Sequence, residues 1–213
     1  IWGADHHGYA PRLKAALKAL GIPEDNLEII ITQLVRLVEN GKEVKISKRA
    51  GTFITLEELV DEVGLDAARF FFLMYSPNTH MNFDMELAKE RSKKNPVYYV
   101  QYAHARIASI LAKIQNPKSK IQNPSQNLKL LNTRSELDLI RKLVELPEIL
   151  RDIAVNYEVH RLPRYSLGLA REFHNFYEKY RVVTEDKNLT SARLGLVTAT
   201  KIVLANTLNL MGI

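Results

Sequence analysis

The sequence has no cysteine among its 213 residues. Without thiols the fold can contain no disulfide and no thiolate metal site, and a reducing compartment such as the cytoplasm is consistent with this composition. Long hydrophobic runs are also missing: no stretch of about 18 apolar residues occurs, so neither a transmembrane helix nor a membrane partner is predicted. The adjacent His6 and His7 have no cluster of ligands at metal-binding spacing around them, so no protein-bound metal is expected.

Strand patterns are few, and they are confined to the first 83 residues. Two extended runs flank Asn40-Gly41, a pair that supplies the positive φ angles of a tight hairpin. Helical patterns surround this hairpin, each with its own start and stop residues. They are a helix from Pro11 to a stop at Gly21, a helix that opens with a Thr55–Glu58 capping box and stops at Gly64, and a buried aromatic helix capped by Asp66.

Beyond Phe83 the pattern is helical. Asp84 is predicted to cap a helix that runs to Lys94, and Asn95-Pro96 to start the next one. A polar segment at 115–134, in which the pentad KIQNP occurs at 113–117 and again at 120–124, is predicted to be a loop. Further helices are predicted over residues 135–157, 163–181 and 190–211, the last central to a bundle. The predicted fold class is mainly α, with a small α/β piece over residues 1–83 and a helical bundle over residues 84–213.

Charge is unevenly distributed between these two parts. Residues 1–83 carry 9 Lys/Arg and 11 Asp/Glu, a net charge of −2, whereas residues 84–213 carry 21 and 13, a net charge of +8. A basic helical part favours an anionic partner such as nucleic acid, but a basic surface that is simply solvated has the same composition.

The stretch VKISKRAG (44–51) places Lys45, Lys48 and Arg49 within five residues. Like charges repel, so this cluster is locally unfavourable unless an anion lies against it. The plainer interpretation is a solvated hairpin tip, and the functional one is a phosphate-binding loop.

Three strings in order resemble arginyl-tRNA synthetases, which are class I aminoacyl-tRNA synthetases: WGADHHGY (2–9), VKISKRAGTFITLEELVDEVGLDAARFFFL (44–73) and NPVYYVQYAHAR (95–106). The resemblance covers nearly the whole chain except 115–134. It implies that residues 1–83 are the C-terminal portion of a Rossmann-like catalytic domain, and that residues 84–213 are the helical anticodon-binding domain often called DALR. Asp66-Ala67-Ala68-Arg69 is similar to the run that gives this domain its name.

The resemblance also implies residues that bind ATP. The string KISKR (45–49) is similar to the KMSKS loop, with Ile and Arg in place of Met and the final Ser. Lys45 and Lys48 would be catalytic, because ammonium groups stabilise the charge that gathers on phosphate oxygens in the transition state. The other implied contacts to ATP, which is the expected substrate together with Mg²⁺, are Ser47 and Arg49 in the loop and Gly3, Asp5 and His6 at a strand end.

Two helical segments combine aromatic rings with cations, as recognition of single-stranded RNA requires. The implied tRNA anticodon-binding residues are Tyr99, Tyr102 and Arg106 in the first segment and Arg171, Tyr177 and Arg181 in the second, where His174 completes a polar stripe. Phe173 and Phe176 lie on a neighbouring stripe and are predicted to belong to the core. The three tyrosines can equally be core or contact RNA, and the resemblance favours contact.

The parent enzyme implied by the resemblance is an arginine-tRNA ligase, which joins L-arginine to AMP at the expense of ATP, releases pyrophosphate, and transfers the arginine to tRNA(Arg). The HIGH motif of class I enzymes does not occur in the sequence, so the chain is expected to be a C-terminal fragment that is inactive by itself. A monomer with no DNA partner is expected. Three alternatives stay open: a free-standing tRNA-binding module, another class I synthetase such as the cysteinyl enzyme, and a helical interaction domain without an RNA role.

Overall fold

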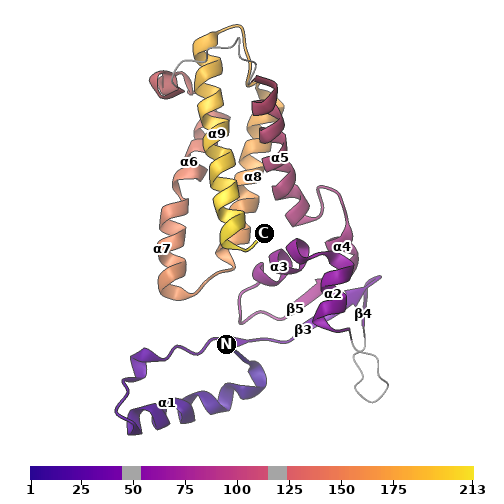
Figure 1. The fold of residues 1–213 in the computed structure, drawn as a ribbon, viewed down its shortest axis with the longest axis vertical. Coiled ribbons are helices and arrows are strands. Elements are labelled where there is room, and N and C mark those ends of the chain that lie inside the picture. Colours follow the sequence, from indigo (N-terminus) through magenta and orange to yellow (C-terminus); the bar gives the residue numbers. More distant parts are fainter. Residues whose placement is uncertain (45–53, 115–123) are drawn as a thin grey trace.

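The computed structural model describes residues 1–44, 54–114 and 124–213, the last range with side chains from Asn127 onward. The basic loop with Lys45, Ser47, Lys48 and Arg49 lies outside the described residues, as does much of the predicted loop at 115–134. Figure 1 shows a bundle of long helices standing on a smaller α/β part, with helix α1 apart from both. The fold class is therefore the predicted one, mainly α with a small α/β portion.

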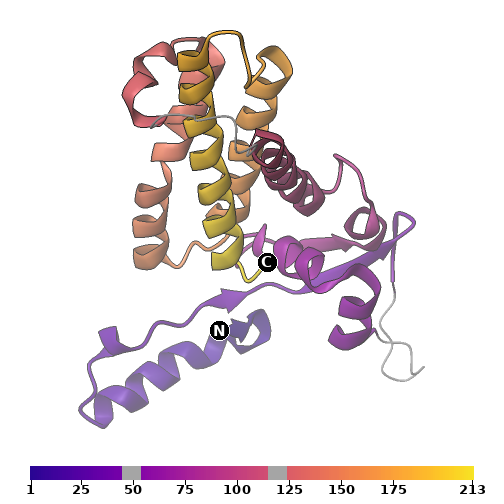
Figure 2. The same cartoon turned by 45° about the horizontal axis from the view of Figure 1, so that its top comes forward.

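The first segment is small and open. Strand β1 (Trp2–Gly3) pairs in parallel with β2 (Ile31–Thr32), and between them lie the 3-10 helices η1 (Ala4–Tyr9) and η2 (Glu24–Asn26) and the helix α1 (Ala10–Ala19). Gly21, at φ +76°, follows the end of α1 as predicted. None of residues 1–34, all of which the structure describes, is buried, and α1 projects away from the bundle in Figure 2.

A three-stranded sheet in the order β4-β3-β5 follows, with β3 at Val35–Glu39, β4 at Lys42–Glu43 and β5 at Met81–Asp84. The predicted hairpin is confirmed: β3 and β4 are antiparallel, and Asn40 and Gly41 between them have φ angles of 51° and 73°. The sequence patterns do not predict β5, which runs parallel to β3 with Leu37 opposite Phe83. Its alternation spans only four residues, too few for a strand period to stand out.

Three short helices cover this sheet: α2 (Leu56–Val63), α3 (Leu65–Leu73) and α4 (Met85–Lys89). The capping box of α2 is present, with the Glu58 amide donating to Thr55 Oγ1 at 3.1 Å and the Thr55 amide donating to Glu58 Oε2 at 2.7 Å. Asp84 caps α4 by accepting from the Leu87 amide at 3.0 Å. The prediction that this helix runs to Lys94 is wrong, because α4 ends at Lys89.

The prediction of Asp66 as an N-cap is also wrong. Helix α3 follows α2 directly through Gly64, which has φ +84° and ends one helix while starting the next. Asp66 lies inside the first turn of α3, where its carboxylate accepts a hydrogen bond from Gln101 Nε2 at 2.8 Å. The residue therefore joins α3 to the bundle instead of capping its own helix.

The bundle consists of α5 (Pro96–Ile114), α6 (Arg134–Val144), α7 (Leu146–Asn156), α8 (Arg161–Lys179) and α9 (Lys187–Leu210), with the 3-10 helix η3 (Pro124–Leu130) before α6. Asn95 starts α5 as predicted, accepting from the Val97 amide at 3.1 Å. The single helix predicted over 135–157 is two helices that meet at Glu145. Pro147 in the first turn of α7 explains the break, since proline has no amide hydrogen to continue the helix.

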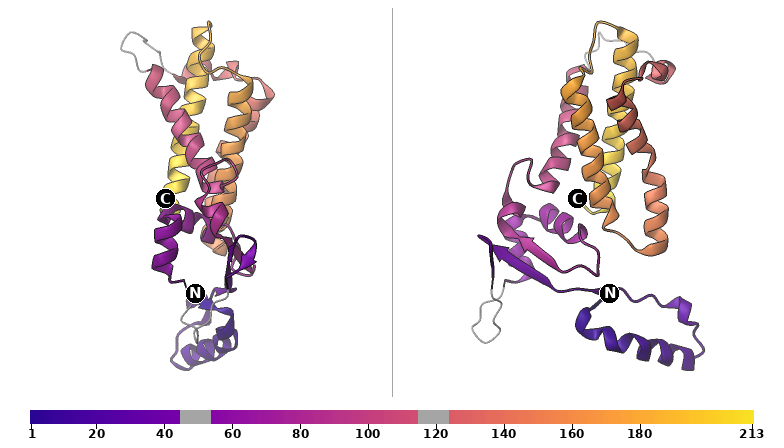
Figure 3. Two further views of the ribbon diagram at one scale, coloured as in Figure 1. Left: turned by 90° about the vertical axis from the view of Figure 1, so that its right-hand side faces the viewer. Right: turned by 180° about the vertical axis from the view of Figure 1, so that it is seen from behind.

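Two hydrophobic clusters hold these elements, and α3 contributes to both. Ala67 and Phe70 face the bundle core, whereas Ala68 and Phe71 face a second core between the sheet and α2 to α4. That second core extends past Phe83 to Met85 and Ala88. In the right-hand view of Figure 3, α3 and the sheet lie below the bundle, at the end where the chain terminates.

Helix α9 lies at the centre of the bundle, where it packs against α5, α6, α8 and η3. Its central place is the predicted one, and Val197 and Leu204 are fully buried. At its end Gly212 has φ +74°, and the carbonyl of Gly212 accepts from Arg69 Nη1 at 2.7 Å. A Cβ at residue 212 would displace that guanidinium, and the positive φ angle favours glycine at this position. Among the described helices, none has the length and apolar character needed to cross a membrane.

Candidate nucleic-acid interface

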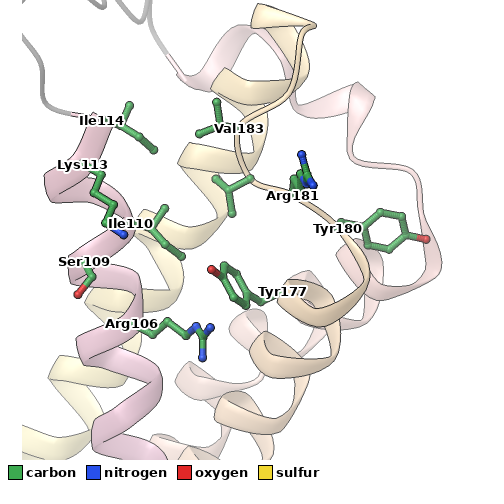
Figure 4. A pocket seen from close by; sticks show the side chains of 10 residues that line it. Arg106, Ser109, Ile110, Lys113, Ile114, Tyr177, Tyr180, Arg181 and Val183 are labelled. Atoms are coloured by element: carbon green, nitrogen blue, oxygen red, sulfur yellow. The ribbon is translucent and has the colours of Figure 1, made fainter.

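A hollow of about 480 Å³ opens between α5 and the end of α8. Figure 4 shows that it is bounded by α5 on one side and by α8 and the following loop on the other, with the Tyr177 ring pointing into it. The residues that line it are Arg106, Ser109, Ile110, Lys113 and Ile114 from α5 and Tyr177, Tyr180, Arg181, Val182 and Val183 from α8 and the loop. Three of the six predicted tRNA-binding residues, Arg106, Tyr177 and Arg181, therefore meet in one pocket.

Arg106 lies at the floor of this pocket between two tyrosine rings. Its guanidinium carbon is 4.5 Å from the centre of the Tyr177 ring and 5.5 Å from that of the Tyr102 ring. Arg106 Nη1 also donates to the Tyr102 hydroxyl at 2.7 Å. These contacts hold the cation in one place without neutralising its charge, which leaves it able to bind an anion.

Aromatic rings extend from the pocket along α5. The Tyr98 and Tyr102 rings are stacked 6.1 Å apart with an interplanar angle of 11°. The His174 ring of α8 packs against this part of α5, with its centre 4.8 Å from that of the Tyr99 ring and 5.9 Å from that of the Tyr102 ring. A row of half-buried rings with one edge in solvent can stack on unpaired bases.

His174 is the member of the predicted polar stripe that does not reach the surface. It is 8% exposed, and its Nε2 has no hydrogen-bond partner among the described residues. Burial is the main cause that lowers the pKa of His174, and the charges of Lys93 and Arg106 lower it further. His174 is therefore neutral at pH 7 and supports the tyrosine rings. Phe173 and Phe176 are fully buried, as predicted.

Arg171 and Arg181 lie at the two ends of the aromatic row, and both are exposed. Burial raises the pKa of Tyr99, and the nearby charge of Arg171 acts in the opposite direction. Within the described part of the chain, no carboxylate lies within ion-pair distance of Arg106, Arg171 or Arg181. Three guanidinium groups that form no ion pair within this part of the chain thus lie beside aromatic rings. We call these three arginines, with Tyr99, Tyr102 and Tyr177, the α5–α8 groove.

A buried ion pair between Arg193 and Glu136 holds the loop that follows α8. Arg193 of α9 donates from Nε to Glu136 Oε1 at 2.8 Å and from Nη1 to the Arg181 carbonyl at 2.8 Å. Burial alone would raise the pKa of Glu136, but hydrogen bonds from Thr133 and Arg193 outweigh it and lower the pKa. The carboxylate is therefore ionised at neutral pH and holds Arg193 in place.

The predicted ATP-contacting residues outside the basic loop lie at the other end of the molecule. Gly3, Asp5 and His6 are at and just beyond the carboxyl end of β1, in a parallel strand pair. Asp5 Oδ1 occupies the space that a Cβ on Gly3 would need, and His6 Nε2 lies 3.6 Å from Asp5 Oδ2. The side chains of Asp5 and His6 are both exposed. In open parallel sheets, nucleotides bind at the carboxyl ends of the strands, which is where these residues lie.

Among the described residues, no group of three or more His, Cys, Asp or Glu side chains could hold a metal ion. The α5–α8 groove offers aromatic faces and guanidinium groups side by side.

The fold and the groove together define the class of helical domains that expose cations beside aromatic rings. Within this class, residues 100–213 match the model of the family described as DALR anticodon binding domain. This match covers more than half of the chain, and the chain belongs to that family.

Curated relatives agree over the whole chain. It is 52% identical to an arginine–tRNA ligase of Desulfitobacterium hafniense and 48% identical to one of Listeria monocytogenes, with all of this chain and 38% of each relative covered. The chain thus spans less than half of the length of these relatives and corresponds to their C-terminal part.

Two solved structures share the fold. A protein of Campylobacter jejuni assigned as an arginyl-tRNA synthetase has a TM-score of 0.84 at 37% identity, covering all of this chain and 45% of that one. The arginyl-tRNA synthetase of Thermus thermophilus has a TM-score of 0.75 at 25% identity, covering all of this chain and 39% of that one. These comparisons confirm the family resemblance that the sequence motifs carry.

Four residues of the groove and its support are absent from the sequence-based prediction: Tyr98, Lys113, Tyr180 and Arg193. Tyr98 and Lys113 follow the helical spacing of Tyr102 and Arg106, so a complete helical wheel of α5 would have included them. Tyr180 lines the pocket although its spacing places it with the buried Phe173 and Phe176. The signal for Arg193 is a lone arginine in an otherwise apolar turn of α9.

Proposed function

We propose that the α5–α8 groove binds the anticodon loop of tRNA(Arg), and that the chain acts as the C-terminal part of an arginine-tRNA ligase. The observation that carries the proposal is the set of guanidinium groups without an ion pair among the described residues, Arg106, Arg171 and Arg181, beside the rings of Tyr99, Tyr102 and Tyr177. Bases released from stacking in a loop would lie on the rings, while the cations would contact the phosphates between them.

In the whole enzyme the proposed reaction has two steps. The carboxylate of L-arginine attacks the α-phosphate of ATP, giving arginyl-adenylate and pyrophosphate, and a terminal hydroxyl of the tRNA then displaces AMP. Lys45 and Lys48 would stabilise the charge that develops on the phosphate oxygens, and Ser47 and Arg49 would contact ATP from the same loop. ATP would enter with Mg²⁺ as its counterion.

Gly3, Asp5 and His6 would lie beside the nucleotide in this enzyme. The exposed Asp5 carboxylate can accept hydrogen bonds from ribose hydroxyls, and the absence of a side chain on Gly3 leaves the room that Asp5 occupies. The parallel pairing of β1 with β2 supports this placement.

The proposal extends to the organisation of the protein. Residues 1–83 would belong to the catalytic domain and residues 84–213 to the anticodon-binding domain, in a monomeric enzyme of the cytoplasm. The alternatives of a cysteinyl enzyme and of a helical interaction domain are disfavoured, because the relatives at about 50% identity are arginine–tRNA ligases and because residues 100–213 match an anticodon-binding family.

A comparison of three arginine substitutions tests the location of the RNA site. Arg106→Met and Arg181→Met each remove one cation from the groove, whereas Arg151→Met removes one from the exposed face of α7, where Arg151 pairs with Glu148 at 3.1 Å. The ligand is an RNA hairpin with the anticodon stem and loop of a bacterial arginine tRNA, called the anticodon hairpin below. Affinity is measured by fluorescence anisotropy at several salt concentrations.

We expect Arg106→Met and Arg181→Met to weaken binding about tenfold and to reduce the slope of log affinity against log salt by about one each. Arg151→Met should change affinity less than about twofold, because its charge is distant from the groove. An equal loss in all three variants would show diffuse attraction by a basic surface and would contradict a site in the groove.

A further inference from the structure

The wall of the pocket formed by residues 180–183 belongs to no helix or strand, yet it is held at two points from α9. Arg193 donates to the Arg181 carbonyl at 2.8 Å, and Thr190 Oγ1 accepts from the Thr184 amide at 2.9 Å. A short loop with its backbone tied on both sides presents its side chains in fixed directions. The Arg181 side chain remains exposed at the rim of the pocket.

Arg193 is built into this arrangement through its whole side chain. The guanidinium carbon lies 5.2 Å from the centre of the Tyr180 ring and 5.9 Å from that of Phe176. Its side chain is 7% exposed and that of its partner Glu136 is 0% exposed. Glu136 in turn is held by the capping box of α6, where Thr133 Oγ1 donates to Glu136 Oε2 at 2.7 Å.

Stability alone gives little reason for a fully buried ion pair in a bundle core. Apolar side chains of similar volume often stabilise a core as well or better, because burying two charges costs their hydration. An apolar residue at 193 could fill the space, but it could not bind a backbone carbonyl on the loop. The fork of the guanidinium reaches Glu136 and the Arg181 carbonyl at once, which a lysine ammonium on one flexible stem cannot match.

We propose that Arg193 is a positioning residue of the nucleotide site: by binding the Arg181 carbonyl it fixes the wall of the pocket and aims the Arg181 guanidinium at bound RNA. The proposal rests on the function proposed above for the α5–α8 groove. Arg193 touches no RNA itself, so its effect is on the geometry of the site and not on the charge presented to solvent.

The test compares Arg193→Lys with Arg161→Lys in the 213-residue chain. Arg161 is a matched control, because it also bridges two helices of the bundle, pairing with Asp152 at 2.7 Å at the opposite end of α8 from the pocket. Two probes are used: the anticodon hairpin, and an abasic hairpin with the same stem whose loop bases are removed. Thermal unfolding of each variant sets a temperature at which all are folded.

We expect Arg193→Lys to bind the anticodon hairpin about tenfold more weakly, the equivalent of one lost hydrogen-bonded contact. The loss toward the abasic hairpin should be smaller, because that loop keeps its phosphates but has no bases to fix them in the pocket. Arg161→Lys should bind both hairpins like the unsubstituted chain. If the Arg193→Lys chain is less stable but binds the anticodon hairpin normally, the proposal is overturned, because Arg193 would then be structural only.

Thr190→Val keeps the test decisive if Arg193→Lys does not fold. This substitution removes the hydroxyl that accepts a hydrogen bond from the Thr184 amide. It therefore loosens the same loop without leaving a buried charge. We expect a loss of about three- to tenfold toward the anticodon hairpin and a smaller one toward the abasic hairpin, and unchanged binding of the anticodon hairpin would overturn the proposal. If the unsubstituted chain binds the two hairpins with equal affinity, the function proposed for the groove is wrong. The role proposed for Arg193 is then wrong as well.

Discussion

Residues 1–34 and the helical bundle are held together in different ways. The first segment has no buried residue, and apolar side chains such as Leu13 in α1 and Leu20 just after it face solvent. The bundle has a continuous core that includes fully buried phenylalanines and a buried ion pair. The stability of the described fold therefore depends on the bundle and on the smaller core beneath it, and substitutions should have unequal effects in the two regions.

The largest effect is expected where the bundle buries charge. Glu136→Ala would leave the Arg193 guanidinium buried without its partner, which costs about 3–5 kcal/mol in the free energy of unfolding. Asp138→Ala serves as the control, since Asp138 pairs with Arg134 and Arg141 on the surface of the same helix. Urea unfolding should show a large loss for the first variant and a small one for the second. Equal losses in the free energy of unfolding would mean that breaking the buried ion pair costs no more than breaking surface ion pairs.

Leucine truncations contrast the two regions directly. Leu204→Ala in α9 removes a fully buried side chain and should cost about 2–5 kcal/mol, because it loses apolar burial and leaves a cavity. Leu13→Ala in α1 should change stability by less than about 0.5 kcal/mol, as is usual for exposed positions. Thermal unfolding followed by far-ultraviolet circular dichroism gives both values. A loss for Leu13→Ala close to that of Leu204→Ala would contradict the contrast.

Two capping boxes provide a finer comparison, because the same motif occurs at α2 and at α6. Thr55→Ala removes a cap whose Glu58 is exposed, and it should cost about 1 kcal/mol. Thr133→Ala also takes a donor from the buried Glu136 carboxylate, so it should cost about 2 kcal/mol. Both variants are compared by urea unfolding at pH 7. The reverse order would show that Arg193 alone is sufficient to hold Glu136.

The smallest effect concerns pH and the buried His174. Its pKa is lowered in the folded state, chiefly by burial, so the unfolded chain binds this proton more readily. The groups that face it are Lys93 and Arg106, which lower the pKa further, Glu178, which raises it, and the Tyr99 and Tyr102 rings. The stability that His174 contributes is therefore complete above pH 6.5 and decreases as the pH falls below 6.5 toward the folded-state pKa.

His174→Phe should flatten this part of the pH profile, by at most about 1.4 kcal/mol per pH unit, the limit for one titrating group. The measurement is the free energy of unfolding of the unsubstituted and His174→Phe chains at pH 7, 6 and 5. An identical slope in the variant would assign the pH dependence to other groups, of which His160, whose pKa is also lowered by burial, is the next candidate.

Much of the fold could be predicted from the sequence, because its boundaries are marked by residues with specific local roles. Gly21, Gly64 and the pair Asn40-Gly41 adopt positive φ angles, and Thr55 and Asn95 accept the hydrogen bonds that start helices. Strand β5 could not be predicted in this way, because its four residues are defined by pairing with a distant strand. The break at Glu145 was marked by Pro147, but helical periodicity continues across it.

Spacing along single helices predicts part of the α5–α8 groove, but it does not predict how the side chains of different helices pack there. Spacing along each helix brought Tyr102 with Arg106 and Tyr177 with Arg181, because neighbours on one helix face are three or four residues apart. It could not show that His174 turns inward, since that depends on how α5 packs against α8. Nor could it show that Arg193, which is 12 residues from Arg181 along the chain, supports the pocket wall.

The most direct test of the proposed site is a titration of the isotope-labelled chain with the anticodon hairpin, followed by backbone amide resonances in NMR. We expect the largest shifts for Tyr99, Arg106, Ser109, Tyr177 and Arg181, in or beside the α5–α8 groove, and unchanged resonances for α1 and α7. Shifts spread evenly over the basic surface, or concentrated on α1 or α7, would contradict the assignment of RNA binding to this groove.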